Sequence, residues 1–183
     1  MIMTYKGILV LSLMLSFQVG FAQGKLMGGY GKAFFGSGDL IGDVVGVGYQ
    51  LFFTDGLGVE ATVQSAWAKR VERDLYHQSS STSICGSFIY RPINGKDHLE
   101  LVLGGLFRNY MGIYGSGYVE EIPEFDPYAP APIIERGFEL GLMAGMNVNL
   151  FSIGEYRFGI RPLLQIGLES EERILSMSLV VLR

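Results

Sequence analysis

The chain has 183 residues, of which 49% are hydrophobic and 17% are charged, and it carries a formal net charge of -4, one cysteine and two histidines. That length suits one domain with a substantial core. The acidic balance disfavours nucleic-acid binding, which needs a basic surface. A single cysteine excludes an intrachain disulfide framework and a cysteine-based zinc site. We therefore expect no metal centre and no cofactor.

The first 22 residues have the organisation of a secretory signal peptide. Lys6 gives a positive start, an apolar run covers about residues 7–21, and Gly20 and Ala22 are small residues of the kind that a signal peptidase reads. The run is shorter than the ~20 apolar residues that a spanning helix needs. We predict export, cleavage after Ala22 and a mature domain over residues 23–183.

The remaining chain alternates with a two-residue period, which indicates β-strands. In residues 138–150 and 156–168, apolar side chains occupy one face and small or polar side chains the other. Other segments follow the same pattern less regularly, the facing of the first, Gly-rich one is ambiguous, and none has the periodicity of a helix. The eight expected strands cover about residues 25–35, 45–53, 57–67, 83–91, 99–108, 138–150, 156–168 and 174–182.

Short and longer connections alternate between these strands. Short turns are expected at Asp55-Gly56, Asn94 to Asp97 and Ser152 to Glu155, and longer loops at Ser37 to Leu40, Arg70 to Ser81, Ser116 to Arg136 and Glu169 to Glu172. Outer-membrane barrels have short periplasmic turns and longer external loops. The order of the connections therefore predicts an N-terminus on the periplasmic side.

Charged side chains of the strands fall on the small, polar face. They are Glu60, Arg91, Glu100, Arg108, Glu139, Arg157 and Arg161. An arginine that faces lipid near the midplane costs about 2–4 kcal/mol, so we expect these residues inside. Eight strands leave an interior that side chains can fill. We predict a paired, hydrogen-bonded network that closes a polar lumen; a proton or ion path through a narrow channel is the alternative.

Aromatic residues gather near both ends of the expected strands. Phe52, Phe53, Tyr90, Phe151, Tyr156 and Phe158 fall toward the periplasmic ends, and Phe34, Trp67, Phe107, Tyr110 and Phe138 toward the outer ends. Girdles of aromatic residues mark both interfaces of membrane barrels. We therefore expect two girdles.

Over nearly its whole mature length, this series of alternating strands resembles the small eight-stranded outer-membrane barrels, the class that includes the OmpA transmembrane domain and OmpX. The resemblance rests on the strands and not on a site motif. It implies an all-β, antiparallel, up-and-down transmembrane barrel in the outer membrane of a Gram-negative bacterium, porin-like in build, monomeric, and surrounded by lipid and lipopolysaccharide. Such barrels usually end in an aromatic residue, whereas this chain ends in Val181-Leu182-Arg183. Pro162, inside an expected strand, predicts a bulge or a broken ladder.

The segment His77-Gln78-Ser79 is the candidate for catalysis. Its His-x-Ser spacing resembles that of the lipid A deacylase barrels, in which a histidine activates a serine and an acid orients the histidine. Glu72 or Asp74 would supply the acid. Because the segment falls in an expected Ser-rich loop, residues 74–82, we favour a solvated loop and keep lipid A acyl hydrolysis as the alternative.

The longest expected loop, residues 115–136, is acidic, and its four prolines favour extended geometry. Its candidate binding residues are Tyr118, Glu120, Glu121, Glu124, Phe125, Asp126 and Tyr128. Three interpretations stay open: a recognition arm for an extracellular or surface protein, a hydrated acidic cap, and a divalent-cation site shared with Glu169, Glu171 and Glu172. With a filled lumen, the sequence predicts a structural or interaction protein rather than an enzyme.

Overall fold

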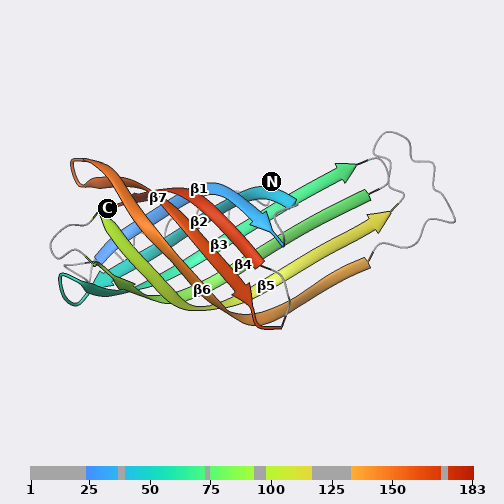
Figure 1. Cartoon of the computed structure of the whole chain (residues 1–183), viewed down its shortest axis with the longest axis horizontal. Coiled ribbons are helices and arrows are strands. Elements are labelled where there is room, and N and C mark those ends of the chain that lie inside the picture. Colours follow the sequence, from blue (N-terminus) through green and yellow to red (C-terminus); the bar gives the residue numbers. More distant parts are fainter. Residues whose placement is uncertain (1–23, 37–39, 73–74, 93–97, 117–132, 170–172) are drawn as a thin grey trace, which may run out of the picture.

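The computed structural model describes residues 24–36, 40–72, 75–92, 98–116, 133–169 and 173–183. These residues form antiparallel strands that pair in chain order, and β1 also pairs with β8, so the sheet closes into a barrel (Figure 1). The strands are β1 Gly24–Phe35, β2 Leu40–Phe52, β3 Leu57–Glu72, β4 Leu75–Tyr90, β5 Leu99–Ser116, β6 Ile133–Ile153, β7 Tyr156–Gly167 and β8 Arg173–Leu182. The all-β, eight-stranded, up-and-down barrel expected from the sequence is confirmed.

At one end of the barrel, here called the turn end, β2 joins β3 and β6 joins β7 through tight turns, and β1 begins and β8 ends there. The side chain of Thr54 closes the first turn, since its Oγ1 accepts hydrogen bonds from the backbone N–H groups of Gly56 at 3.3 Å and Leu57 at 3.0 Å. In the second turn, Gly154 has a φ of +61°, a conformation that glycine adopts without a steric penalty. Glycine at the first central position is typical of two-residue hairpin turns.

At the opposite end, four neighbouring strands continue past the others. β3 to β6 have 16 to 21 residues, whereas β1, β2, β7 and β8 have 10 to 13. The surplus forms a sheet, here called the wall, that rises from one side of the rim (Figure 1). The wall consists of residues 69–72, 75–78, 110–116 and 133–138.

The bounds of two expected loops are wrong, because strand residues replace the ends of these loops, most of them in the wall. The sequence predicts loops over Arg70 to Ser81 and Ser116 to Arg136, but β4 begins at Leu75 and β6 begins at Ile133. Four consecutive residues at the start of β6, 133–136, are exposed, so both faces of the sheet contact water there. Where both faces are wet, no alternation of apolar and polar residues marks a strand. The expected strands are therefore too short at this end.

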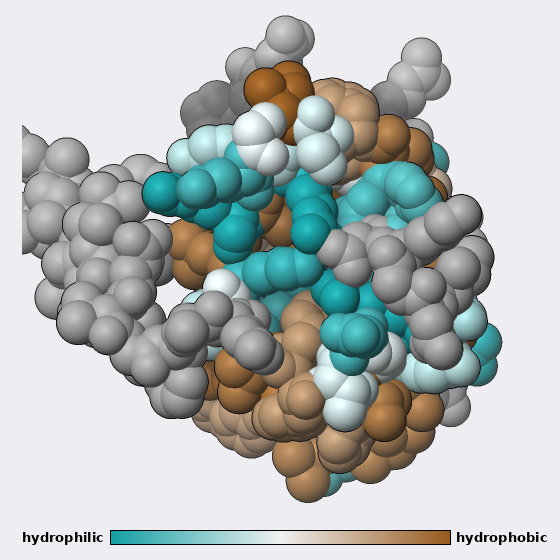
Figure 2. All heavy atoms as spheres, turned by 90° about the vertical axis from the view of Figure 1, so that its left-hand side faces the viewer, coloured by the Kyte–Doolittle hydropathy of each residue, from teal (hydrophilic) through white to brown (hydrophobic). Residues whose placement is uncertain are grey.

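Within the barrel, successive side chains alternate between exterior and interior. In β8, Leu175, Met177 and Leu179 face outward with exposed fractions of 50%, 55% and 69%, whereas Ser176 and Ser178 are buried. Viewed from the turn end, polar side chains fill the middle and apolar ones surround them (Figure 2). This arrangement is that of a membrane barrel. In the described part of the chain, no helix is long and apolar enough to cross a membrane.

The alternation settles the facing of β1 and corrects two of the expected girdle residues. Ala33 and Phe35 of β1 are buried inside, and Tyr30 faces outward. Phe52, the last residue of β2, is also buried and shares the inward face with Gln50, whereas Phe53 just after the strand is exposed. Tyr110 shares the inward face of β5 with the buried residues of that strand. The remaining expected girdle residues face outward; Phe151 does so because the register of β6 shifts just before it.

Pairing between β6 and β7 is irregular opposite Pro162. The ladder is interrupted between the pairs Gly145↔Leu163 and Val148↔Ile160, and the register shifts between Asn149 and Phe151. Proline has no backbone N–H to donate to a ladder, so a closed barrel must break its pairing on one side of this residue. The expected local break is confirmed.

Candidate functional site

The lumen near the turn end holds two ion pairs. Arg91 donates from Nη2 and Nε to Oε1 of Glu100, at 2.8 and 3.2 Å. Arg161 donates from Nη1 to Oε2 of Glu60 at 2.9 Å, and its Nη2 contacts the other carboxylate oxygen. All four side chains are buried. Charge-assisted hydrogen bonds of this kind are the strong ones, and they offset the cost of removing charges from water.

Two amides join these ion pairs into one network. Nε2 of Gln50 donates to Oε2 of Glu60 at 2.8 Å and to Oε2 of Glu100 at 3.3 Å, and Nδ2 of Asn147 donates to the same oxygen of Glu100 at 2.9 Å. Sequence reasoning on charges missed both amides. The strand pairing could have identified them, because Gln50 lies opposite Glu60 in the ladder and Asn147 lies opposite Glu100.

A separate ion pair lies closer to the wall. Nε of Arg108 donates to Oε1 of Glu139 at 2.7 Å, and Nη2 contacts the same oxygen. Both side chains have an exposed fraction of 0%. The two residues are direct neighbours across β5 and β6. The structure thus brings together six of the seven charged residues placed in the lumen by the sequence, in three pairs.

The remaining residue of that set, Arg157, is partly buried near the turn end. In the same region two cations lie over the inward-facing ring of Phe52. The guanidinium carbon of Arg91 is 3.5 Å from the ring centroid, and Nζ of Lys25 is 5.2 Å from it. Cation–π contacts of this kind stabilise the positive charges near the turn end of the lumen.

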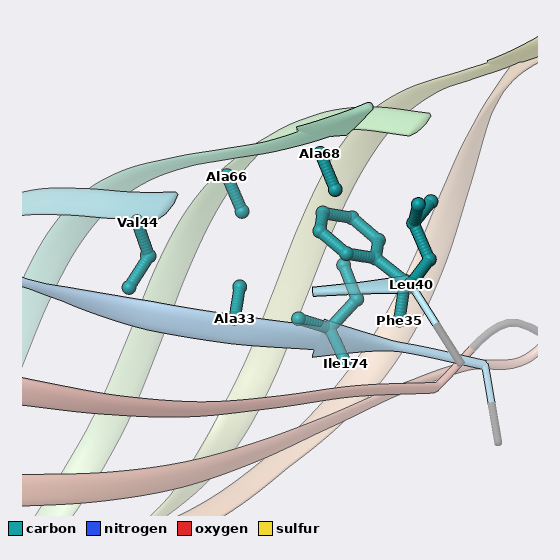
Figure 3. Packing of buried hydrophobic residues seen from close by; sticks show 7 residues of the cluster. All are labelled: Ala33, Phe35, Leu40, Val44, Ala66, Ala68 and Ile174. Atoms are coloured by element: carbon teal, nitrogen blue, oxygen red, sulfur yellow. The ribbon is translucent and has the colours of Figure 1, made fainter. Parts of the chain in front are cut away.

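The lumen is not polar throughout. Toward the wall, seven buried apolar residues from β1, β2, β3 and β8 pack against one another, here called the plug (Figure 3). The plug consists of Ala33, Phe35, Leu40, Val44, Ala66, Ala68 and Ile174. A cavity of about 20 Å³, lined by Gln64, Arg161 and Ser176 among others, has room for about one water molecule. Buried side chains thus occupy the interior at the level of the plug and at the level of the polar network.

The catalytic candidates His77 and Ser79 lie on β4 and not in a loop, so the expected loop over residues 74–82 is wrong. Both face inward, and Ser79 is 1% exposed. The His77 ring lies 4.4 Å from the ring of Tyr114. An acyl hydrolase in a membrane barrel has to present its nucleophile to a lipid chain, which the inward placement of Ser79 does not favour. Glu72 ends β3, and Asp74 lies outside the described residues.

Other predicted features also fall outside the described residues. These are the signal peptide, the binding residues Tyr118, Glu120, Glu121, Glu124, Phe125, Asp126 and Tyr128 of the long loop, and Glu171 and Glu172 of the last loop. Glu169 lies just after β7 and is exposed. In the part of the chain that the structure describes, no three histidine, cysteine or acidic side chains gather in a way that could hold a metal ion.

An outward-facing polar group on β1 and β2 was not predicted. Asp43 accepts hydrogen bonds from Oη of Tyr30 and from Nζ of Lys32, both at 2.7 Å. Lys32 and Asp43 are direct cross-strand neighbours, and Asp43 lies opposite Trp67 on its other side. Because Trp67 faces outward near the wall end, the group marks the level at which an apolar exterior gives way to a polar one.

No protein-family model and no curated protein sequence matches the chain. Solved structures match it in fold.

Ail, the attachment invasion locus protein of Yersinia pestis, has a TM-score of 0.58 at 12% identity, covering 86% of this chain and 95% of its own. A major outer membrane protein from Thermus thermophilus has a TM-score of 0.57 at 11% identity, covering 87% and 99%. Neisserial surface protein A has a TM-score of 0.52 at 10% identity, covering 87% and 95%. By architecture, this chain has the fold of the small eight-stranded outer-membrane β-barrel proteins.

Proposed function

We propose that the chain is a non-conducting interaction protein of the bacterial outer membrane, with its turn end in the periplasm and its wall outside the cell. The observation that carries the proposal is the combination of a filled barrel with four strands that extend beyond it on one side. A barrel that served only as a channel would need an open lumen and no wall.

The apolar exterior supports a membrane location. Leu103 of β5, Leu142 of β6 and Leu179 of β8 face outward and are each more than half exposed. A continuous apolar surface of this extent is rare on a monomeric soluble protein. The predicted signal peptide fits export, and a Gram-negative outer membrane is the environment in which barrels of this kind are found.

The tight turns at one end and the long strands at the other support the orientation. Outer-membrane barrels have short periplasmic turns and longer external loops. The acidic loop expected between β5 and β6 would then lie outside the cell together with the wall, where lipopolysaccharide and surface proteins of other cells are accessible.

The wall supports an interaction role. Ordering a residue in a strand costs conformational entropy, and inside the barrel apolar burial or hydrogen bonding offsets that cost. In the wall, Ile133, Ile134 and Arg136 are exposed, so burial offsets little of it. Contact with a partner would supply the burial that offsets the cost of ordering these strands, and would explain why the sheet extends into water. Ail, which shares the fold, is called an attachment invasion locus protein and has been solved with the heparin analogue sucrose octasulfate.

Adherence of cells that display the chain tests the interaction role. A variant that lacks residues 70–77 shortens the β3–β4 hairpin symmetrically, because Arg70 pairs with His77. We expect this variant to keep the heat-sensitive gel mobility of a folded barrel and to lose binding to immobilised host or bacterial surfaces. Deletion of residues 118–134 separates the contribution of the acidic loop. Unchanged adherence in both variants would contradict the proposal.

Planar-bilayer recording of the purified barrel tests the absence of conduction. We expect no stable conductance steps, because three buried ion pairs and the plug fill the lumen. Reproducible steps above leak would establish a channel and remove this part of the proposal.

A further inference from the structure

The inner face of the wall, which continues the lumen surface beyond the rim, carries three aromatic rings. Tyr110 and Tyr114 share the inward side of β5 with the buried Arg108, and His77 shares the inward side of β4 with the buried Ser79. His77 and Tyr114 are cross-strand neighbours with ring centroids 4.4 Å apart and planes inclined by 39°. The three rings therefore lie on the same side of the sheet, the side that continues the lumen surface.

Glycines let two of these rings lie on the sheet instead of standing away from it. The ring of Tyr110 lies across Gly137, its cross-strand neighbour; a Cβ at that position would be 3.0 Å from the tyrosine Oη. The ring of Tyr114 lies over Gly112, where a Cβ would be 2.9 Å from Cε2. Covering a glycine with an aromatic ring stabilises a strand, but it also turns the second face of the ring away from the sheet.

Charged residues border the rings on both sides and balance one another. Arg70 of β3 lies in the same row as His77 and Tyr114, and Glu135 of β6 lies opposite Gly112. Both charged side chains are exposed. Among the side chains that the structure describes, this inner face thus offers Arg70 as a cation, Glu135 as an anion, phenol hydroxyls and ring faces. A polyanion gains no net attraction from it, whereas a neutral polyol meets both donors and acceptors.

The free edges of the wall are less suited to a partner than its inner face. On the β3 edge lie Lys69 and Arg70, and on the β6 edge lie Glu135 and Arg136. Charged side chains on an exposed edge are a common protection against the addition of another strand. An extended peptide that pairs with either edge is therefore disfavoured.

We propose that this inner face, formed by Arg70, His77, Tyr110, Tyr114 and Glu135, binds a neutral oligosaccharide. One apolar C–H face of a sugar ring stacks on the tyrosines, and its hydroxyl groups hydrogen-bond to the guanidinium and the carboxylate at the borders. The plug lies below, so the ligand rests on the rim and does not enter the barrel. The inference deepens the proposed function, on which it rests, by naming the chemical class of the partner.

Titration calorimetry and saturation-transfer NMR on the full mature chain test the proposal. The chain is held in a detergent without a sugar head group, since a maltoside would compete. The probes are maltoheptaose, a mannan oligomer and a dextran oligomer as neutral sugars, and a sulfated heparin hexasaccharide as the anionic comparison. We expect at least one neutral probe to bind more tightly than the sulfated one, and Tyr114→Ala to weaken that binding about tenfold.

Three variants make the test specific to ring geometry. Tyr114→Phe keeps the ring and is expected to retain most of the affinity. Gly137→Ala keeps every proposed contact residue but lifts the Tyr110 ring, and is expected to weaken binding. Tyr90→Ala removes an exposed tyrosine at the turn end and is expected to change nothing. The heat-sensitive gel mobility verifies that each variant is folded.

The outcomes separate this inference from the proposed function. Folded protein that binds none of the neutral probes, or binds the sulfated probe more tightly, overturns the oligosaccharide site; adherence that still depends on residues 70–77 then leaves the interaction role standing. Neutral-sugar binding that is unaffected by Tyr114→Ala and Gly137→Ala also overturns the site, because the rings would not be responsible. Sugar binding that depends on the rings, with adherence unchanged by both the hairpin deletion and the loop deletion, supports the site and contradicts the interaction role.

Discussion

Along β5, a single strand passes from the barrel into the wall, and its inward-facing residues change on the way. In the barrel, Leu106 and Arg108 are fully enclosed, one by apolar neighbours and the other by its carboxylate partner. In the wall, Tyr110 and Tyr114 lie on glycines and remain partly exposed. The strand geometry is continuous, so the difference comes from the surroundings: one half is held by tertiary contacts and the other mainly by its ladder.

The largest expected difference in unfolding free energy is between two glutamates on the inward face of β6, one in the barrel and one in the wall. Glu139→Ala would leave Arg108 fully buried without the carboxylate that it contacts, and should lower the free energy of unfolding by about 3–5 kcal/mol. Glu135→Ala, four residues earlier on the same face, should change it by less than about 0.5 kcal/mol because that side chain is exposed. Denaturant unfolding in detergent measures both. Equal effects would mean that the wall is as tightly held as the barrel.

A substitution in the plug is expected to cause the next largest loss of stability. Leu40→Ala removes a side chain that is 1% exposed and leaves a cavity among Phe35, Ala68 and Ile174, so we expect a loss of about 2–5 kcal/mol. Its neighbour Ile41 faces outward and is 56% exposed, and Ile41→Ala in the same detergent is the matched control with a smaller expected loss. A larger effect at Ile41 would contradict the assigned facing of β2.

The bridging amide of the polar network has a smaller expected effect. Gln50→Leu keeps the volume of the side chain but removes hydrogen bonds to two carboxylates, Glu60 and Glu100, and should cost about 1.5–3 kcal/mol. The same unfolding experiment measures it, with Gln50→Glu as a second variant that places a third carboxylate in the network and should be worse. If Gln50→Leu leaves the free energy of unfolding unchanged, the two ion pairs do not need the amide that connects them.

The smallest expected effects on stability come from substituting two glycines, one in the barrel and one in the wall. At Gly104 in the barrel, a Cβ would be 2.2 Å from the backbone oxygen of Gly86, so Gly104→Ala forces the ladder apart and should cost about 1–3 kcal/mol. At Gly137 in the wall, a Cβ meets the far end of the Tyr110 ring, which can rotate away. Gly137→Ala should therefore leave the unfolding midpoint nearly unchanged. A larger loss at Gly137 than at Gly104 would mean that the ring packing holds the wall together.

Sequence alone predicts the barrel wherever two different environments act on the two faces of a strand. In β8, alternation of apolar residues with Ser176 and Ser178 identifies both the strand and its facing. The inward charges are predictable for the same reason, and so is the break at Pro162, because its backbone lacks a donor.

The rest depends on information that alternation does not carry. Ser79, Ser80 and Ser81 have no contrasting faces, so β4 starts eight residues before the strand that the sequence indicates at residues 83–91. Partner choice is equally hidden: Arg161 pairs with Glu60, 101 residues away, across a lumen whose width follows from closure of all eight strands. Local neighbours such as Gln50 and Glu60 become predictable once the register between β2 and β3 is known.

The wall occupies only the side of the rim formed by β3 to β6, since β1, β2, β7 and β8 end lower. The space above the plug, as the described residues bound it, is therefore a half-shell with one open side and not a well. A ligand can approach it sideways, parallel to the membrane surface. The surface can accordingly hold an internal segment of a long polymer while both ends of the polymer continue beyond the protein. Binding then requires neither a short ligand nor a free end of the polymer.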